Sequence, residues 1–184
     1  MTDSRFLRSL RAVRQFDSRR IDDAVLLDIV QTGRWTGSSK NTQPWEVVVV
    51  RERSHLQHLA TLGRYAQHVA GATAALALVM DGDDAETGFD EGRLAQNLML
   101  AAWTHGVGSC IGSLYPERNQ AAGSDLLGIP PERHLRTILS LGYPAPGATA
   151  PVGSRGGIQL GRKPLPQFVS WERYGVRQAP GVNA

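Results

Sequence analysis

Two groups of cationic residues, one near each end of the chain, could bind a phosphorylated ligand. Arg11 and Arg14 stand close together near the start, and Arg162 and Lys163 are adjacent near the end. A phosphate monoester carries nearly two negative charges, and a guanidinium donates hydrogen bonds to it in a fixed fork. The two groups could therefore converge on one phosphate, although long cationic side chains are most often simply exposed to solvent.

A short polar segment, residues 36–44, could bind the edge of a flat heterocyclic ring. It combines the hydroxyls of Ser38 and Ser39 with the amides of Asn41 and Gln43, just before an apolar run. Amide side chains both donate and accept hydrogen bonds, so they can pair with a ring edge that alternates acceptors and a donor. Without a ligand, such a segment is simply a loop.

A glycine-rich segment, residues 106–113, could bring its backbone close to the same kind of ring. Glycine allows close approach, and a free N–H at this place could donate a hydrogen bond to the ring. The glycine spacing does not fit the dinucleotide-binding fingerprint. The segment also follows an expected helix and leads into a strand, the reverse of that motif. We therefore exclude a Rossmann site.

Other catalytic patterns are weak. His55 and His58 are three residues apart on an expected helix, but no third ligand stands nearby, so we expect no metal site. The sequence has no nucleophile elbow, and Cys110 lacks the surroundings of a nucleophile. We expect His105 to help cap a helix, whereas His68 and His134 have no obvious partners. We expect no catalytic side chain, which suits an enzyme whose cofactor supplies the reactivity.

Helices and strands alternate around these segments. Asp22 is expected to cap a helix that stops at Gly33. Expected helices cover residues 4–10, 22–33, 53–62, 91–105 and 117–127. Expected strands cover residues 45–51, 74–80, 107–111 and 135–141. The order alone does not decide between parallel and antiparallel pairing.

Two segments carry apolar residues that need a partner. The helix expected over residues 91–105 is apolar nearly all the way round, which is typical of a helix buried inside a domain or between subunits. Residues 144–157 read as an exposed linker. The tail beyond the linker carries large apolar side chains that must be covered, on its own subunit or on a partner: Leu165, Phe168, Val169, Trp171 and Tyr174.

Composition limits the class of protein. The 184 residues, 41% hydrophobic and 20% charged, suit one globular domain. Six arginines among the first twenty residues contribute to a net charge of +3, but no nucleic-acid-reading module accompanies them. The longest weakly polar run, residues 68–80, is too short to span a membrane, and we expect no secretory signal. A single cysteine makes no internal disulfide, and we expect a cytoplasmic protein.

Taken in order, these segments resemble the nitroreductase family over about residues 11–174. The Ser-Ser-x-Asn-x-Gln-Pro-Trp segment is the most specific part of the resemblance. The matching elements are Arg11-x-x-Arg14-x-Phe16, Ser38-Ser39-x-Asn41-x-Gln43-Pro44-Trp45, Gln96-Asn97-Leu98 with Ala101-Ala102, Gly106-x-Gly108-Ser109-Cys110-Ile111-Gly112, Leu141-Gly142-Tyr143-Pro144 and Arg162-Lys163-Pro164-Leu165.

The resemblance implies an α+β fold, with a mostly antiparallel central sheet surrounded by helices. It implies one domain, residues 1–184, in an intertwined homodimer with two FMN sites at the interface, and a tail of about residues 158–184 packed on the partner. Gln43 would support the loop that binds the flavin, and Gly112 and Ser113 would present backbone near the flavin N5. The cofactor-binding residues implied are Arg11, Ala12, Arg14, Ser38, Ser39, Asn41, Gln43, Ile111, Gly112, Ser113, Arg162 and Lys163.

The implied activity is transfer of hydride from NAD(P)H to a nitroaromatic or quinone by a ping-pong mechanism. Three alternatives stay open: another reaction of the same family, a flavin or deazaflavin store without turnover, and a basic nucleic-acid-binding protein. Leu10 and Ala12 depart from the family pattern, which bears on flavin affinity. The short stretch over residues 81–90 predicts an open substrate side.

Overall fold

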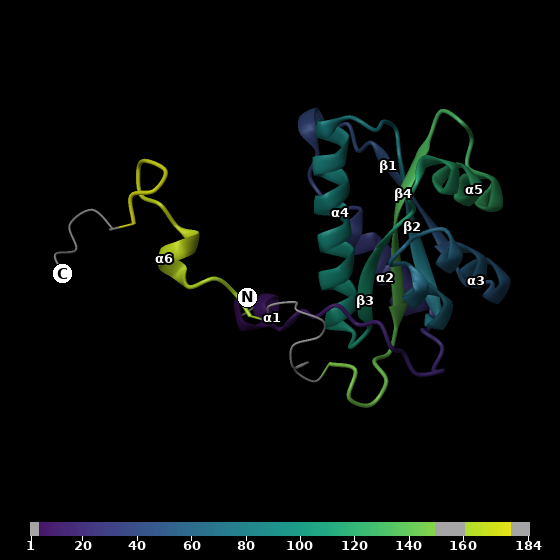
Figure 1. Cartoon of the computed structure of the whole chain (residues 1–184). Helices are drawn as coiled ribbons and strands as arrows, with labels where there is room; N and C mark the ends of the chain where they lie inside the picture. The colour runs from purple at the N-terminus through teal and green to yellow at the C-terminus, as the bar shows by residue number, and fades with distance from the viewer. Residues whose placement is uncertain (1–3, 150–160, 178–184) are drawn as a thin grey trace. The chain divides into compact units, whose positions relative to one another are not determined.

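The computed structural model describes residues 4–149 and 161–177. The chain divides into two compact units, residues 1–149 and 150–184, and each is described by itself. The first unit holds the sheet and all but one of the helices described (Figure 1). The expectation of one domain with its tail on a partner subunit stays a prediction.

A four-stranded sheet forms the centre of the first unit. Its strands are β1 (Trp45–Val50), β2 (Ala74–Met80), β3 (Gly108–Ser113) and β4 (His134–Gly142), in the order β1-β2-β4-β3. Every neighbouring pair is antiparallel, so the predicted α+β fold with a mostly antiparallel sheet is confirmed. The central strand β2 is buried along its whole length, which explains its uninterrupted apolar sequence.

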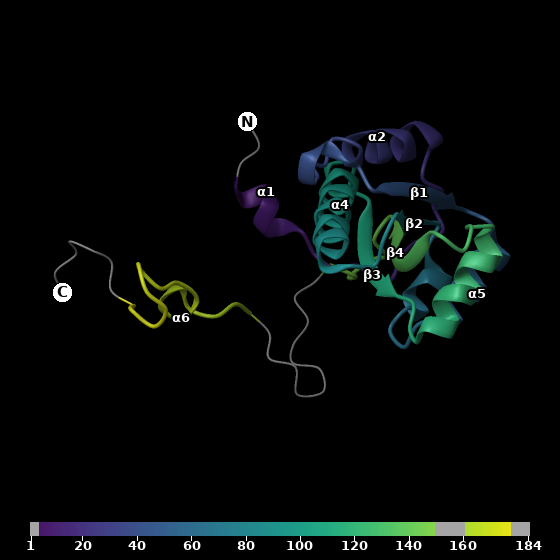
Figure 2. The ribbon, with the colours of Figure 1, turned by 90° about the horizontal axis from the view of Figure 1, so that it is seen from above.

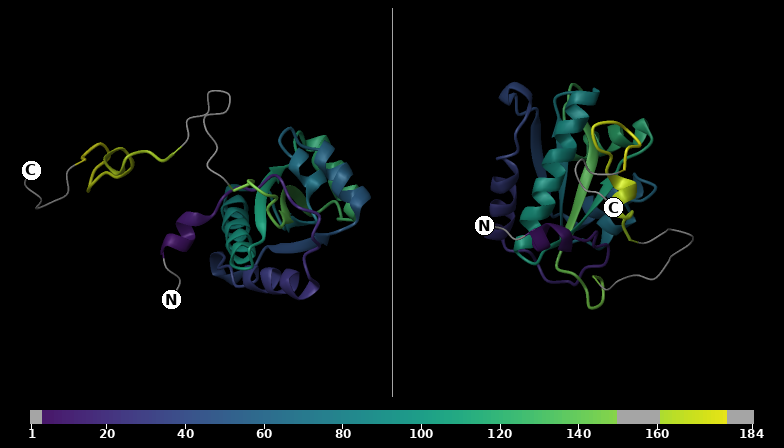
Figure 3. Two further views of the ribbon diagram at one scale, coloured as in Figure 1. Left: turned by 90° about the horizontal axis from the view of Figure 1, so that it is seen from below. Right: turned by 90° about the vertical axis from the view of Figure 1, so that its left-hand side faces the viewer.

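Helices cover both faces of the sheet (Figures 2 and 3). On one face, α2 (Asp23–Gly33) and α4 (Ala85–Thr104) pack on β2 side chains such as Leu76 and Leu78. On the other face, α3 (Arg53–Thr61), the short 3-10 helix η2 (Gln67–Gly71) and α5 (Glu117–Leu127) cover Ala75 and Ala77. A separate helix, α1 (Ser4–Ser9), precedes them.

Helix α4 begins earlier than predicted, at Ala85 instead of Glu91. Asp84 caps it: the carboxylate accepts the backbone N–H of Thr87 at 2.7 Å. The same hydrogen bond is the main reason that the pKa of Asp84 lies below its ordinary value. Phe89 is the only large apolar residue in the first turns of α4, residues 85–90, so apolar periodicity did not reveal them.

Helix α2 begins after Asp22 and ends at Gly33 as predicted, but neither end is formed in the predicted way. Asp22 stands at the N-cap position, but its side chain makes no capping hydrogen bond. Gly33 is the last helical residue, and a Cβ there would lie 2.4 Å from Cδ2 of Leu98 on α4. Gly33 therefore lets α2 approach α4 closely, and its role is packing between helices.

The second unit contains one short helix, α6 (Leu165–Phe168). In the described part of this unit, residues 161–177, the large apolar side chains are exposed, among them Leu165, Phe168 and Tyr174. Most of the predicted linker, residues 150–157, lies outside the described residues. Across the two described ranges, no helix has both the length and the apolar character that a membrane span requires.

Candidate functional site

The segment of Arg11 to Arg14, called here the arginine strap, runs beside the start of β3. The N–H of Val13 donates to the carbonyl of Ser109 at 2.8 Å, and Ala12 forms an isolated parallel bridge with Ser109. A Cβ on Gly108 would lie 2.7 Å from Cβ of Val13. Gly108 therefore permits a close backbone approach, although its partner is the strap.

Both arginines of the strap are exposed. Arg11 donates through Nη1 to the carbonyl oxygens of Arg8, at 2.8 Å, and Leu10, at 2.9 Å, which ties it to the end of α1. Arg14 forms no salt bridge with any carboxylate in the part of the chain that the structure describes. Its positive charge lowers the pKa of His68, so its field reaches the sheet beside β3. The strap can thus offer uncommitted positive charge to an anion.

The second half of β3 lies at the open edge of the sheet. Because Ser109 uses its carbonyl to bind the strap, alternation directs the N–H groups of Ile111 and Ser113 away from β4 as well, while the carbonyl of Ser113 lies against Gly63. The side chain of Ile111 is 47% exposed, and that of Ser113 is exposed too. The intervening Gly112 is buried against Ala66 and His68, 3.5 Å from where its Cβ would stand. This edge can therefore receive a flat ligand through backbone N–H groups.

A buried polar cluster lies behind this edge. Nδ1 of His68 is 2.7 Å from Oγ of Ser140, which also donates to the carbonyl of Cys110 at 3.3 Å. Burial is the main cause that lowers the pKa of His68, and the charge of Arg14 adds to it, so the imidazole is neutral. Nε2 of His68 is enclosed and makes no hydrogen bond of acceptable geometry with any described residue.

His68, for which the sequence showed no obvious partner, has one in the structure. The partner, Ser140, is 72 residues away in the sequence, and no local pattern could have revealed it. Burial raises the pKa of Cys110, so this thiol stays protonated, as its lack of activating neighbours suggested. His105 closes α4 as its C-cap residue and binds Asp28 of α2, with Nε2 2.7 Å from Oδ2.

The polar loop, residues 36–43, has an unusual backbone that includes the 3-10 helix η1 (Ser39–Asn41). Three of its residues have positive φ: Lys40 at 49°, Asn41 at 56° and Gln43 at 50°. Side chains seldom tolerate this region, and such strain is concentrated at functional sites. Oγ of Ser38 accepts the backbone N–H of Gln43 at 2.8 Å, which closes the loop; the supporting role expected of Gln43 in the flavin site stays a prediction. The side chains of Ser39 and Asn41 remain exposed.

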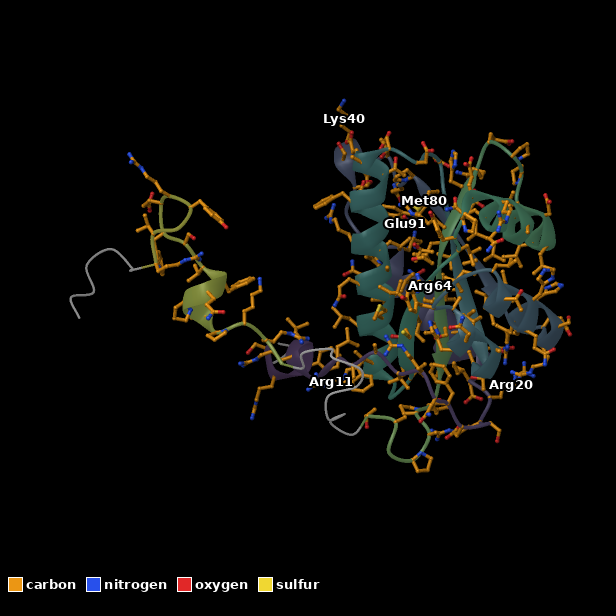
Figure 4. All side chains as sticks on the ribbon, viewed as in Figure 1. Arg11, Arg20, Lys40, Arg64, Met80 and Glu91 are labelled. Atoms are coloured by element: carbon orange, nitrogen blue, oxygen red, sulfur yellow. The ribbon has the colours of Figure 1, made fainter. Side chains whose placement is uncertain are left out.

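Helix α4 separates the loop from the strap. Asp90 and Asn97 of α4 bind the loop, whereas Trp103, thirteen residues after Asp90, binds Ser9 beside the strap at 2.9 Å. At 1.5 Å per residue, Asp90, which binds Ser39, is about 20 Å from Trp103 along the helix, and Asn97, which binds Thr36, is about 9 Å from it. Figure 4 shows Lys40 and Arg11 at opposite ends of α4. One chain therefore does not bring the strap and the loop together.

Two further predicted site residues, Arg162 and Lys163, belong to the second unit. Both side chains are exposed, and Arg162 donates to the carbonyl of Gly161 at 3.2 Å. Their convergence with the strap stays a prediction. Within residues 4–149 and 161–177, no group of three or more metal-binding side chains is arranged around a common point.

The residues present fit a phosphorylated flat ring such as FMN. The strap offers arginine charge without a carboxylate partner, and β3 offers outward backbone donors. Ser109 adds a buried hydroxyl with no hydrogen-bond partner among the described residues. The strained loop exposes an amide and hydroxyls of the kind that pair with a ring edge or a ribityl chain.

Comparison with known proteins gives one consistent result. The sequence model described as "Nitroreductase family" matches residues 7–86 and 62–143. A protein of Archaeoglobus fulgidus named "Putative NADH dehydrogenase/NAD(P)H nitroreductase" is 31% identical over 140 residues, 73% of this chain and 80% of that protein. The "NADH dehydrogenase" of Thermus thermophilus is 24% identical over 200 residues, covering 88% of this chain and 91% of that protein.

Solved structures share the fold at low identity. An FMN-dependent nitroreductase from Clostridium difficile is 22% identical, with a TM-score of 0.70 over 76% of this chain and 86% of that chain. A structure from Desulfovibrio desulfuricans, solved in complex with FMN, is 24% identical, with a TM-score of 0.75 over 95% and 99%. These structures show that the first unit has a fold known from solved proteins.

Proposed function

Because the chain belongs to the nitroreductase family, we propose that it is an FMN-dependent oxidoreductase that works as a homodimer. In this proposal it passes hydride from NAD(P)H to a nitroaromatic, a quinone or a similar electrophilic acceptor. The observation that carries the proposal is the separation of the arginine strap and the polar loop by the length of α4. Each chain then holds two half-sites, and a second copy completes both.

Exposed apolar side chains support pairing of two copies. Trp35, at the end of α2, is 78% exposed, Phe89 on α4 is 69% exposed and Leu27 on α2 is 70% exposed. All three belong to the helical layer of α2 and α4, and large exposed apolar groups are favoured in protein interfaces. These two helices carry and hold the polar loop. A partner that covers this layer would also receive the loop.

Each half-site has a distinct task. Arg11 and Arg14 of one subunit would bind the phosphate, with Arg162 and Lys163 adding charge, and the backbone of Ala12 would line the same place. Ser38, Ser39 and Asn41 of the other subunit would bind the ribityl chain and the ring edge. Outward N–H groups of Ile111 and Ser113, on either side of the buried Gly112, would donate to the ring.

Bound FMN would supply the redox chemistry, taking hydride from the nicotinamide and returning electrons to the acceptor. The chain contributes orientation and charge. The thiol of Cys110 is buried and protonated, and the imidazole of His68 is neutral and enclosed, so neither is placed to deliver a proton from the surface. Water is then the source of the protons.

The acceptor side is proposed to be open. Only residues 81–84 connect β2 to α4, and no lid element is built from them. A bulky acceptor could therefore approach the ring. Grafting a longer segment between Asp84 and Thr87 should narrow the range of acceptors; unchanged selectivity would contradict this part of the proposal.

The purified protein gives the first test. It should be yellow, and mass spectrometry of the released chromophore should identify FMN at two per dimer. Anaerobic NADH or NADPH should bleach the colour, and steady-state double-reciprocal plots should give parallel lines. A bound flavin that no nicotinamide reduces would favour a flavin store. A chromophore with the mass of a deazaflavin would show that the cofactor is not FMN. Salt-sensitive DNA binding by a protein without a chromophore would refute the proposal.

A further inference from the structure

We infer that Asp90 is a positioning residue, supported by Arg93, that fixes the polar loop in the conformation with which it completes the flavin site of the partner subunit. The inference rests on the proposed function and adds a residue to its flavin site. Asp90 is called a positioning residue because it would touch neither flavin nor substrate. Its task is to hold Ser39 and Asn41, which would.

A polar stripe on α4 faces the loop. Asp90, Arg93 and Asn97 are spaced i, i+3 and i+7, so they share one side of the helix. Asp90 accepts the N–H of Ser39 at 3.4 Å, and Nδ2 of Asn97 donates to Oγ1 of Thr36 at 2.8 Å. The helix therefore binds the loop at two points, Thr36 and Ser39, both of them before the residues with positive φ.

Asp90 is only 2% exposed, an unusual position for a carboxylate. One carboxylate oxygen accepts Nη1 of Arg93 at 3.1 Å, and the other accepts the Ser39 N–H. A buried charge persists when it is paired and hydrogen-bonded. Here the ion pair supplies the charge balance, and the second oxygen is left to bind the loop.

Gly37 makes room for this arrangement. A Cβ on Gly37 would stand 3.0 Å from Nη2 of Arg93, closer than most carbon contacts. The guanidinium thus fills the space beside the loop backbone. The loop in turn keeps three residues at positive φ, a conformation that lasts only where the surroundings impose it. The Ser39 contact lies immediately before the first of those three residues, Lys40.

The neighbouring acid on α4 shows that burial alone does not assign this role. Glu91 is 4% exposed and ion-paired, with Oε2 2.5 Å from Nη2 of Arg136. Arg136 belongs to β4, so Glu91 ties α4 to the sheet and has no hydrogen bond to the loop. Asp90 and Glu91 are therefore matched: adjacent, acidic, buried and paired, but bonded to different parts of the fold.

The test compares Asp90→Ala and Asp90→Asn with Glu91→Ala and Glu91→Gln in the full-length protein. FMN affinity is measured by fluorescence titration of the flavin-stripped protein, and hydrogen exchange reports the amides of residues 39–43 without flavin. Asp90→Ala should weaken FMN binding about tenfold, the equivalent of about 1.4 kcal/mol, and should speed exchange in the loop. Asp90→Asn keeps one oxygen for Ser39, so it should fall between Asp90→Ala and the wild type.

Both Glu91 variants should keep FMN affinity within about twofold of the wild type, even where their melting temperatures fall as far as those of the Asp90 variants. Equal losses of affinity in the two series would overturn the inference, because a general weakening of α4 would then explain them. Unchanged affinity or unchanged loop exchange in Asp90→Asn and Asp90→Ala would overturn it as well. A wild-type protein that binds no FMN would instead refute the proposed function itself.

Discussion

Replacing Gly108 by alanine should displace the arginine strap and weaken cofactor binding without touching any ligand-binding side chain. The new Cβ would lie 2.7 Å from Cβ and from Cγ2 of Val13, and 2.9 Å from its Cγ1. Carbon atoms pack at about 3.5–4.0 Å, so the strap would have to retreat by about 1 Å. Val13 is fully buried, so the displacement would disturb packed neighbours.

The energetic effect follows from that displacement. Overpacking a buried site costs about 1–3 kcal/mol, and the hydrogen bond from Val13 to Ser109 would lengthen beyond its present 2.8 Å. In a protein of this size each kcal/mol lowers the melting temperature by about 2–4 °C. Arg14 follows Val13 directly, so it would move with the strap. FMN affinity should therefore fall about tenfold, in line with loss of one charge-assisted contact.

Thermal unfolding and FMN titration measure the two effects, with Gly71→Ala as the control. A Cβ on Gly71 would meet nothing within 4 Å, so this variant should match the wild type in both assays. Adding Val13→Gly to Gly108→Ala removes the clash. The double variant should be less destabilised than the sum of its two single variants. A Gly108→Ala protein with the melting temperature and FMN affinity of the wild type would refute this view of the strap. So would a double variant whose loss of stability equals the sum of the losses in the two single variants.

Two further predictions concern single residues. Arg14→Ala should weaken FMN binding by about 1.5–3 kcal/mol, measured by titration, and undiminished flavin occupancy would make the phosphate assignment wrong. For His68 the folded pKa lies below the ordinary value of 6.5, so the unfolded chain binds the proton more readily as the pH falls through 6.5. The stability contributed by neutral His68 should be complete above that pH and be lost below it. The free energy of unfolding is measured with denaturant at pH 5.5 and at pH 7.5. His68→Gln should reduce the difference between these two free energies, and an unchanged difference would contradict the assignment.

Local patterns predicted most of the secondary structure. The apolar run of residues 74–80 is a strand buried on both faces, and its sequence shows that directly. The first turns of α4 were missed because they carry one large apolar residue, Phe89, too few to show a helical period, and only the Asp84 cap marks the start. Gly33 was read as a stop signal because its true constraint, the side chain of Leu98, lies on another helix. Such constraints arise only once the elements have packed.

In the site, too, the sequence predicted short segments but not the contacts between residues far apart in the chain. The strap and the loop each carry a recognisable sequence, but the distance between them is set by the length and packing of α4. The hydrogen bonds from Asp90 to Ser39 and from His68 to Ser140 join residues 51 and 72 positions apart. Periodicity cannot reveal such pairs. The positions of Arg162 and Lys163 relative to the strap stay predictions.

A mixed dimer tests most directly whether each flavin site is shared between two chains. Arg14→Ala damages the strap, and Asn41→Gly removes a loop side chain while suiting its φ of 56°. Each variant alone should bind FMN weakly at both sites. A dimer that combines one copy of each, isolated with two affinity tags, should bind one FMN with wild-type affinity, because one site then receives an intact strap and an intact loop. Two weak sites and no site of wild-type affinity would contradict the shared arrangement.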